Sequence, residues 1–320
     1  NTIPILSNVL LESEDGRLNL AATDLDIAIG ESVVAETQEP GGITAPAHTL
    51  YDIVRKLPDG SQVELYYDLD STRLSISAGR SRFTLSCLPR EDFPVMSEGE
   101  FPVNFKVTGV NLKRLIDKTR FAVSTEETRY YLNGIYLHAA TDDNGENVLR
   151  GVATDGHRLA RFDMDQPEGA ADMPGIIVPR KAVGELRKLI DEYEGEVKVS
   201  LSDTKIRFSF SDIVLTSKLI DGTFPDYTRV IPEGNDKNME VNSNVLAESV
   251  DRVSTISTDK TRSVKLAMGA GQLKLSVHSP EHGTATEELL VSYESDDMEI
   301  GFNSRYLLDI LAQIEGDTVQ

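Results

Sequence analysis

Hydrophobic and polar residues alternate with a period of two along much of the first hundred positions. Segments 8–12 and 17–21 both show this alternation, and the pair Asp15-Gly16 between them is typical of a tight turn. The pattern predicts a β-hairpin at the beginning of the chain. The elements predicted after it are a strand at 27–36, a helix at 46–57 that begins with Pro46, and strands at 62–69, 72–78 and 82–88.

The central part of the chain adds a helix at 111–123 that has no counterpart before the first hairpin, followed by a strand at 130–138. This helix is amphipathic, because its apolar and basic side chains fall on opposite faces at 100° per residue. Its basic residues are Lys113, Arg114, Lys118 and Arg120, and its apolar face carries Leu115, Ile116, Ala122 and Val123. A helix at 179–191 repeats the arrangement, with Lys181, Arg187 and Lys188 opposite Ala182, Val183, Leu186, Leu189 and Ile190.

Short segments of the chain recur in register. Ala22-Thr23-Asp24 returns as Ala153-Thr154-Asp155, and Phe93-Pro94 returns as Phe224-Pro225, both after 131 residues. A fainter third copy matches Leu18-Asn19-Leu20 to 273–275. The repetition predicts three homologous domains, each strand-rich with few helices, which makes the fold class α+β. The predicted domains are 1–103, 104–230 and 231–320.

The same repetition predicts elements beyond both ends of the sequence. The central repeat has a helix before its first strand, whereas only seven residues precede the first strand of the first repeat. The third repeat stops at Val319-Gln320, where a new strand should begin after a turn at Gly316. We therefore expect a further helix before residue 1 and about two further strands after residue 320.

Charge is distributed unevenly over these elements. The chain of 320 residues has a formal charge of −21, which excludes a protein that coats nucleic acid by its overall basic character. The helices predicted at 46–57, 109–123, 179–191, 242–262 and 303–315 nevertheless carry a combined charge of +5, so all other residues carry −26. These basic faces are either the ordinary solvated faces of amphipathic helices or a local surface that contacts phosphate.

Composition narrows the class of protein further. Hydrophobic residues make up 39% of the chain, enough for a large core and unlike a disordered protein. No apolar run reaches the length of a membrane span, so no membrane association is expected. Cys87 is the only cysteine, which permits no internal disulfide and suits the reducing cytoplasm.

Motifs of catalysis are missing from the sequence. It has no glycine-rich phosphate loop, no nucleophile elbow and no Cys/His spacing typical of a metal site. Asp155 and His157 could suggest a catalytic pair, but the matching copy keeps Thr23-Asp24 and has no histidine, so a turn explains them better. The pair Tyr130-Tyr131 is interpreted as strand residues, or as side chains that contact a nucleic-acid strand.

Longer stretches of sequence resemble a known family. They are "NTIPILSN" (1–8), "ATDLDI" (22–27), "SRFTLS" (81–86), "RYYLNGIYL" (129–137), "VATDGHRLA" (152–160), "IIVPRKAV" (176–183), "SKLIDGTFPDYTRVIP" (217–232) and "MEIGFNSRYLLDIL" (298–311). Together they are similar to the β subunit of bacterial DNA polymerase III, the replicative sliding clamp, over essentially the whole chain. The resemblance implies three similar domains with the DNA clamp fold, and two chains closed head-to-tail into a ring around duplex DNA. Helices would line the inside of the ring and antiparallel sheets its outside.

The same resemblance implies partners and the residues that meet them. A clamp of this kind has no catalytic activity and no cofactor or metal, works in the cytoplasm at the nucleoid, and binds double-stranded DNA without reading its sequence. The implied DNA-facing residues are Arg55, Lys56, Lys113, Arg114, Lys118, Arg120, Tyr130, Tyr131, Arg180, Lys181, Arg187 and Lys188. Two positions depart from the family pattern: His48 stands where relatives can offer an arginine, and Glu126 where they can offer a neutral polar residue.

The resemblance also implies a pocket between the second and third domains. It would accept short linear peptides of the DNA polymerase III catalytic subunit, the clamp loader and other clamp-binding proteins. The matching residues are Leu132, Thr154, Gly156, His157, Arg158, Leu159, Pro225, Arg229, Val230, Asn303 and Tyr306, with Thr261 smaller than expected at the edge. The family pocket also uses a C-terminal segment that this sequence does not contain.

Ring closure in the family pairs edge strands of the first and third domains, and the matching apolar residues are Phe83, Leu85 and Ile256. Phe83 and Leu85 could instead be core residues. Two other classes of protein stay open at this point: an enzyme of nucleic-acid metabolism on a clamp-like fold, which would need a convergent set of catalytic residues, and a monomeric interaction module, which would lack the basic helix faces.

Overall fold

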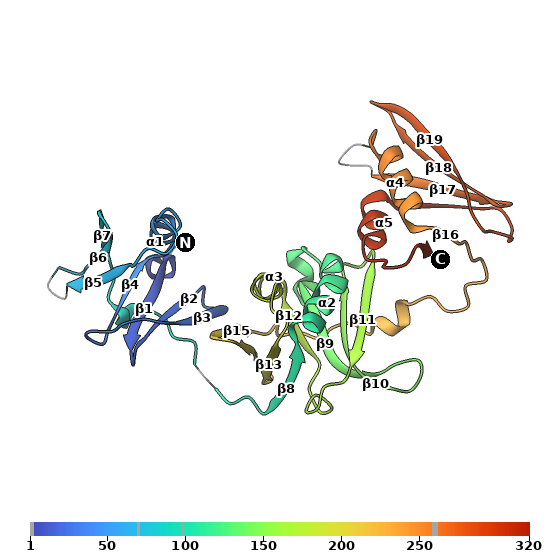
Figure 1. The fold of residues 1–320 in the computed structure, drawn as a ribbon. Helices are drawn as coiled ribbons and strands as arrows, with labels where there is room; N and C mark the ends of the chain where they lie inside the picture. The colour runs from blue at the N-terminus through green and yellow to red at the C-terminus, as the bar shows by residue number, and fades with distance from the viewer. Residues whose placement is uncertain (1–2, 69–70, 98, 258–261) are drawn as a thin grey trace. The chain divides into compact units, whose positions relative to one another are not determined.

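The computed structural model describes residues 3–68, 71–97, 99–257 and 262–320 (Figure 1). The chain forms two compact units, Asn1–Thr223 and Phe224–Gln320. The first unit contains the first two sequence repeats, and the second unit contains the third.

The first repeat begins with a short 3₁₀ helix and a β-meander. Asp15 and Gly16 both have positive φ angles, 49° and 74°, which is the conformation of the predicted hairpin turn. Its elements are η1 (Pro4–Ser7), β1 (Asn8–Glu14), β2 (Arg17–Thr23), β3 (Ile27–Val34), β4 (Gly41–Pro46), α1 (Ala47–Val54), β5 (Glu64–Asp68), β6 (Arg73–Ala78), β7 (Ser81–Ser86) and η2 (Arg90–Asp92).

The central repeat follows the same order of strands and helix after one extra strand and one extra helix. These elements are β8 (Val103–Thr108), α2 (Gly109–Thr119), η3 (Arg120–Ala122), η4 (Glu127–Leu132), β9 (Gly134–Thr141), β10 (Asn147–Thr154), β11 (Leu159–Asp165), β12 (Ile176–Pro179), α3 (Arg180–Leu189), β13 (Glu196–Leu201), β14 (Lys205–Phe210) and β15 (Ile213–Lys218). Strands β9 to β12 form a sheet in the order β11-β10-β9-β12.

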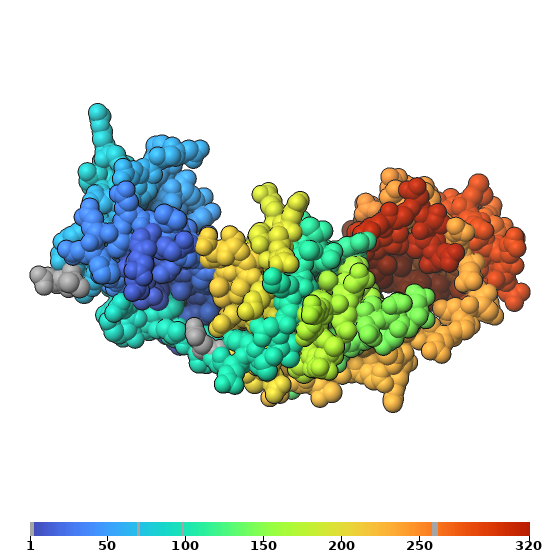
Figure 2. All heavy atoms as spheres, turned by 60° about the horizontal axis from the view of Figure 1, so that its bottom comes forward, coloured from blue at the N-terminus to red at the C-terminus, as the bar shows by residue number. Residues whose placement is uncertain are grey.

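One sheet runs through both repeats of the first unit. Its strand order is β4-β1-β2-β3-β15-β14-β13-β8, and every neighbouring pair is antiparallel. The repeats meet where β3 pairs with β15, with Ile29 opposite Leu215. Figure 2 shows the blue atoms of the first repeat directly against the yellow atoms of the central repeat. Backbone hydrogen bonds therefore continue across the boundary between the repeats.

Helices α2 and α3 bury the faces that the sequence predicts to be apolar. Leu115 and Ile116 of α2 belong to the same buried core as Leu186 of α3. A Cβ atom added to Gly151 of β10 would lie 2.9 Å from Cδ2 of Leu115, so this glycine lets α2 approach the sheet closely. The basic faces of both helices are thereby left on the side away from the core.

The second unit pairs a four-stranded sheet with two helices. The sheet has the order β19-β18-β17-β20, and α4 and α5 contact each other and pack on the core that this sheet supplies. Its elements are η5 (Tyr227–Val230), β16 (Val241–Asn242), α4 (Ser243–Ser254), β17 (Ser263–Gly269), β18 (Gln272–Ser279), β19 (Gly283–Leu290), β20 (Met298–Asn303), α5 (Ser304–Leu311) and β21 (Thr318–Val319). The strand expected after Gly316 is present as β21, which pairs with β16.

The structure corrects several predicted boundaries. The strand predicted at 130–138 is wrong at its beginning, because Tyr130 and Tyr131 lie in the 3₁₀ helix η4 and β9 begins only at Gly134. A Cβ atom at Gly134 would collide with the carbonyl oxygen of Val178, so the close pairing with β12 begins at the residue without a side chain. The helices also end earlier than predicted: α1 at Val54, α2 at Thr119, α3 at Leu189, α4 at Ser254 and α5 at Leu311.

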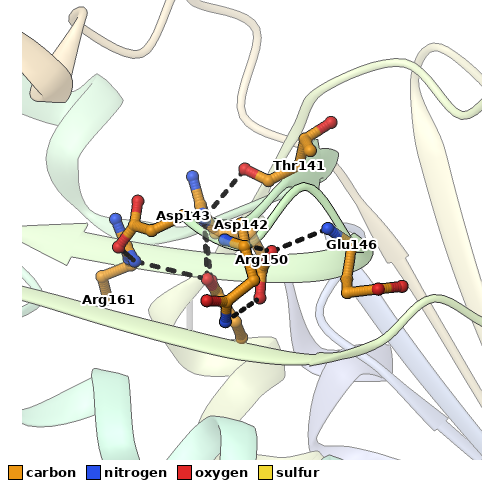
Figure 3. Close-up of polar contacts among 8 residues, drawn as sticks. Thr141, Asp142, Asp143, Glu146, Arg150 and Arg161 are labelled. Atoms are coloured by element: carbon orange, nitrogen blue, oxygen red, sulfur yellow. Dashed lines mark hydrogen bonds and ion pairs between the residues drawn. The ribbon is translucent and has the colours of Figure 1, made fainter.

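A buried charged group on β10 holds this strand to its neighbour β11, the edge strand of the sheet (Figure 3). The Arg150 side chain on β10 is only 7% exposed, and its Nε and Nη2 atoms donate to the two carboxylate oxygens of Asp163 on β11 at 2.6 and 2.7 Å. Arg161 reaches Asp143 at 3.2 Å in the adjoining β9–β10 turn. This bidentate pairing compensates the loss of water around Arg150 and fixes the register of the two strands.

The described part of the chain contains no helix with the length and apolar character of a membrane span.

Candidate DNA-contacting and peptide-binding sites

Helix α2 presents its predicted basic residues on the face opposite the core. The Thr108 side chain caps the helix by accepting a hydrogen bond from the Asn111 backbone N–H at 3.2 Å. Arg114 and Arg120 are exposed, and Lys113 and Lys118 are half-buried. The Arg114 guanidinium also lies 5.5 Å from the centre of the Phe162 ring, which orients it against the protein surface.

Helix α3 carries its basic residues next to Tyr130. Arg180, Lys181 and Tyr130 line an open hollow of about 560 Å³, together with Glu185. The Tyr130 side chain is 53% exposed and meets Tyr131 edge to face, with 5.8 Å between ring centres. The structure thus brings together the two kinds of side chain, cationic and aromatic, that the sequence assigned to nucleic-acid contact.

Carboxylates accompany these cations. Asp191, just after α3, accepts from Lys113 Nζ at 2.9 Å and from Arg187 Nη1 at 2.6 Å. Arg187 also donates from Nε to Asp117 at 2.7 Å, and its side chain is only 17% exposed. Hydrogen bonds from Arg187 and then Lys113 hold the pKa of Asp191 at about 2, and the same carboxylates raise the pKa of Arg187. Arg187, which the family resemblance implies to face DNA, is therefore engaged within the protein.

The remaining basic residues predicted to face DNA belong to α1 and its C-terminal end. Arg55 pairs with Asp52 at 2.8 Å and lies 5.5 Å from the Tyr51 ring centre, whereas Lys56 is exposed. His48, which departs from the family pattern, is exposed on the same helix.

The turn at 154–158 is the centre of the predicted peptide site in the first unit. Thr154 Oγ1 donates to the Arg158 carbonyl oxygen at 2.7 Å, and Asp155 Oδ1 accepts from the N–H groups of His157 and Arg158 at 2.9 and 3.0 Å. Gly156 has a φ angle of +87°, which side chains rarely adopt. These bonds place His157 on the exposed crest of the turn.

Neighbouring side chains support this turn. The Arg158 side chain is 12% exposed, donates from Nε to Asp155 Oδ2 at 3.1 Å, and lies 5.4 Å from the Phe121 ring centre. Arg129 contacts the turn at Gly156 and pairs with Glu126 at 2.7 Å. The hydrogen bond from Arg129 holds the pKa of Glu126 below its usual value. The sequence prediction did not include Arg129, although its spacing of three residues from Glu126 signals this pair.

Two further residues of the predicted site flank the turn. Leu132 is buried at the end of η4, and Leu159 is half-buried at the beginning of β11. The first-unit members of the predicted site therefore lie on η4 and on the turn between β10 and β11, and Arg129 links the two.

The other predicted peptide-binding residues belong to the second unit. Pro225 and Val230 are exposed, and Arg229 is paired at 2.9 Å with Asp226, which caps the 3₁₀ helix η5. Asn303 caps α5 by accepting from the Arg305 N–H at 3.0 Å, and Tyr306 is half-buried in the first turn of that helix. Thr261 lies outside the described residues. The joint pocket of both groups remains a prediction from the resemblance.

The residues predicted for ring closure have different surroundings. Phe83 lies on β7, an edge strand of its sheet, and is 36% exposed. Leu85 on the same strand is buried in the core of the first repeat, as the alternative interpretation of the sequence held. Ile256 is half-buried and packs against the core of the second unit. Phe83 is thus the residue of the three best placed to meet another chain. Within the described ranges, no group of His, Cys, Asp and Glu residues has the arrangement of a metal site.

Comparison with known families identifies the family of the chain. The chain matches the N-terminal domain of the DNA polymerase III β subunit over residues 1–97, the central domain over 106–226 and the C-terminal domain over 228–320. It is 55% identical to the β sliding clamp of Caulobacter vibrioides over 316 residues, covering 99% of this chain and 85% of that protein. The chain belongs to the β sliding clamp family.

Solved clamps have the same fold. A Bartonella birtlesii sliding clamp bound to griselimycin superposes with a TM-score of 0.96 at 55% identity, covering 99% of this chain and 85% of that one. A Pseudomonas aeruginosa clamp superposes with a TM-score of 0.92 at 42% identity and the same coverage. The β sliding clamp is a non-catalytic subunit of DNA polymerase III and a processivity factor in DNA replication, so DNA and the polymerase are its implied partners.

Proposed function

We propose that this clamp closes head-to-tail with a second copy around duplex DNA and turns the basic faces of α2 and α3, together with Arg55 and Lys56 after α1, toward the phosphates. The observation that carries this proposal is the division of α2 and α3 into two faces. One face of each helix is buried in a shared core, and the opposite face carries the basic residues in a protein whose charge is −21.

This distribution of charge suits a protein that must hold DNA without binding it at one place. Contacts between basic side chains and phosphates attract any duplex equally, because phosphates carry no sequence information. The acidic remainder of the surface repels DNA. A closed ring needs little affinity per contact, since its link to DNA is topological.

We further propose that short linear peptides of the polymerase, the clamp loader and other partners bind at the turn of Thr154–Arg158. This proposal is supported by the exposed crest at His157, which the hydrogen bonds of Thr154 and Asp155 hold in one conformation. Arg158 and Asp155 satisfy each other there, so a peptide can bind without leaving a buried charge unpaired. Arg229 and Tyr306 are proposed to contribute contacts from the second unit.

A retention experiment tests the ring. Clamps loaded onto nicked circular DNA should remain bound at moderate salt and should be released once the circle is cut at one site. The matched control is the same cut DNA with a bulky protein blocking both ends, which should restore retention. Equal retention on circular DNA and on open linear DNA would contradict encirclement.

A further inference from the structure

Several basic side chains on and near α2 and α3 form ion pairs with carboxylates of the same unit. Asp191 holds Lys113 and Arg187, and Asp117 holds Arg187 and, at 3.5 Å, Arg120. Some of these partners are far apart in sequence, which shows that the tertiary fold aligns them. Lys113 and Asp191 are 78 residues apart, and they share a second bond from Nζ to the Asp191 carbonyl oxygen at 2.8 Å.

Lys181 at the beginning of α3 has its partner in the other repeat. Its Nζ donates to Oδ2 of Asp24, which lies in the turn between β2 and β3 of the first repeat. Oδ1 of the same aspartate accepts from the backbone N–H groups of Asp26 and Ile27 at 3.0 and 2.9 Å. Partial burial acts to raise the pKa of Asp24, but the bonds from Lys181 and from the backbone together hold that pKa below its usual value.

We infer that Asp24, Asp117 and Asp191 are built-in counter-anions that keep the affinity of the DNA-facing helices low. The inference rests on the proposed function, because it requires α2 and α3 to face the duplex. Each carboxylate occupies the position beside a cation that a phosphate would otherwise take, so a phosphate has to compete for Lys113, Lys181 and Arg187. Passing from one phosphate to the next then breaks only weak interactions, and the clamp moves along DNA with little resistance.

Arg187 and Asp191 show that this arrangement also has a positional role. Two carboxylates hold the Arg187 guanidinium, which keeps α3 in register with α2 and the residues after α3. Removing the charge of Asp191 while keeping its oxygen acceptor separates the electrostatic role from the positional one. Asparagine does this at Asp191, because its Oδ1 can still accept the bonds from Lys113 and Arg187. At Asp24 its Oδ1 can keep the two backbone bonds, whereas its Nδ2 cannot accept from Lys181.

The test measures binding of a short linear duplex, which can thread the ring, by fluorescence anisotropy over a series of salt concentrations. Asp191→Asn should bind more tightly, and the slope of log affinity against log salt should steepen by up to about 0.9, because the variant releases Lys113 while Asp117 still holds Arg187. Asp24→Asn, which releases Lys181, should steepen the slope by a similar amount. On long DNA, both variants should diffuse more slowly than the unchanged clamp in single-molecule tracking.

The matched control is Glu299→Gln, which removes the same charge from the exposed pair of Glu299 and Lys265 at 3.1 Å on the sheet of the second unit. Its affinity and slope should equal those of the unchanged clamp. If Asp191→Asn and Asp24→Asn behave like this control while Arg180→Ala weakens binding, the counter-anion inference is overturned and the DNA-facing assignment stands. If Arg180→Ala also has no effect, the DNA-facing assignment itself fails. Thermal melting of each variant checks that it is folded.

Discussion

Two turns of the first unit have the same backbone and different surroundings. In the first repeat, Thr23 Oγ1 donates to the Ile27 carbonyl at 2.8 Å, and Asp24 Oδ1 accepts from two backbone N–H groups. In the central repeat, Thr154 and Asp155 make the corresponding bonds. The residue after each aspartate has a positive φ angle, 81° in the first turn and 87° in the second.

The two turns differ in the partner of the aspartate Oδ2 atom. Asp24 Oδ2 accepts from Lys181 of the next repeat, whereas Asp155 Oδ2 accepts from Arg158 within its own turn. The first turn therefore uses its charge to join two repeats, and the second is complete by itself. A change of one ionic partner thus distinguishes a loop that joins two repeats from its duplicate, at which we propose that peptides bind.

The largest expected effect comes from removing the carboxylate of the self-contained turn. Asp155→Ala deletes two charge-assisted bonds to the backbone and the ionic bond to the nearly buried Arg158 guanidinium, so it should lower the free energy of unfolding by about 2–3 kcal/mol. Chemical denaturation followed by circular dichroism measures this. Asp24→Ala should cost less, because Lys181 is exposed and can be solvated. An equal loss of unfolding free energy in Asp155→Ala and Asp24→Ala would show that the ionic partner of the aspartate does not distinguish the two turns.

The next largest effect on stability should come from replacing the residue with a positive φ angle in the central turn, Gly156. Gly156→Leu places a side chain against Arg129 in a strained conformation and should destabilise the clamp by about 1–2 kcal/mol. It should also weaken the binding of a clamp-binding peptide in an anisotropy titration.

The reciprocal change, Leu25→Gly, is the matched control. It relieves strain at an exposed leucine but makes the unfolded chain more flexible, so stability should change little. Peptide affinity should stay the same. A change in peptide affinity as large as that caused by Gly156→Leu would contradict the assignment of peptide binding to the central turn alone.

The smallest expected effect concerns the joint between the repeats. A double-mutant cycle with Asp24→Asn and Lys181→Met should give a coupling energy of about 0.2–1 kcal/mol at pH 7, since the pair is partly exposed. The pKa of Asp24 is lowered in the folded state, so its contribution is present above the usual carboxyl pKa and is lost as pH falls through the lower folded value.

Coupling measured by thermal melting should therefore be constant from pH 8 to about pH 5 and should fade below about pH 4. A coupling that grew as the pH fell would contradict an ionised Asp24 in the joint.

The sequence predicted those features that depend on local periodicity. The buried faces of α2 and α3 follow from residues three and four apart, such as Ala182, Val183 and Leu186, and the structure confirms them. The threefold repeat was visible because turn residues such as Thr23 and Thr154 are constrained by their own backbone. The family models confirm the three domains, whereas the exact boundaries of the domains stay predictions.

Features that depend on the tertiary fold could not be predicted from local patterns in the sequence. The pairs Arg187–Asp117 and Lys113–Asp191 join residues 70 and 78 positions apart, so no local spacing reveals that these cations are engaged. Tyr130 and Tyr131 have high strand propensity, yet the close approach of Gly134 to β12 delays the strand. The DNA-facing, peptide-binding and ring-closing assignments stay predictions.

The pairing of β3 with β15 has a mechanical consequence. Five residue pairs, from Ile213 opposite Glu31 to Ser217 opposite Ile27, connect the first two repeats through the backbone. A load applied along these strands is shared by all the bonds at once, whereas a hinge made of a single connecting segment would yield at one residue. Separating the first two repeats therefore requires breaking the backbone hydrogen bonds between β3 and β15 as well as extending the segment that connects them.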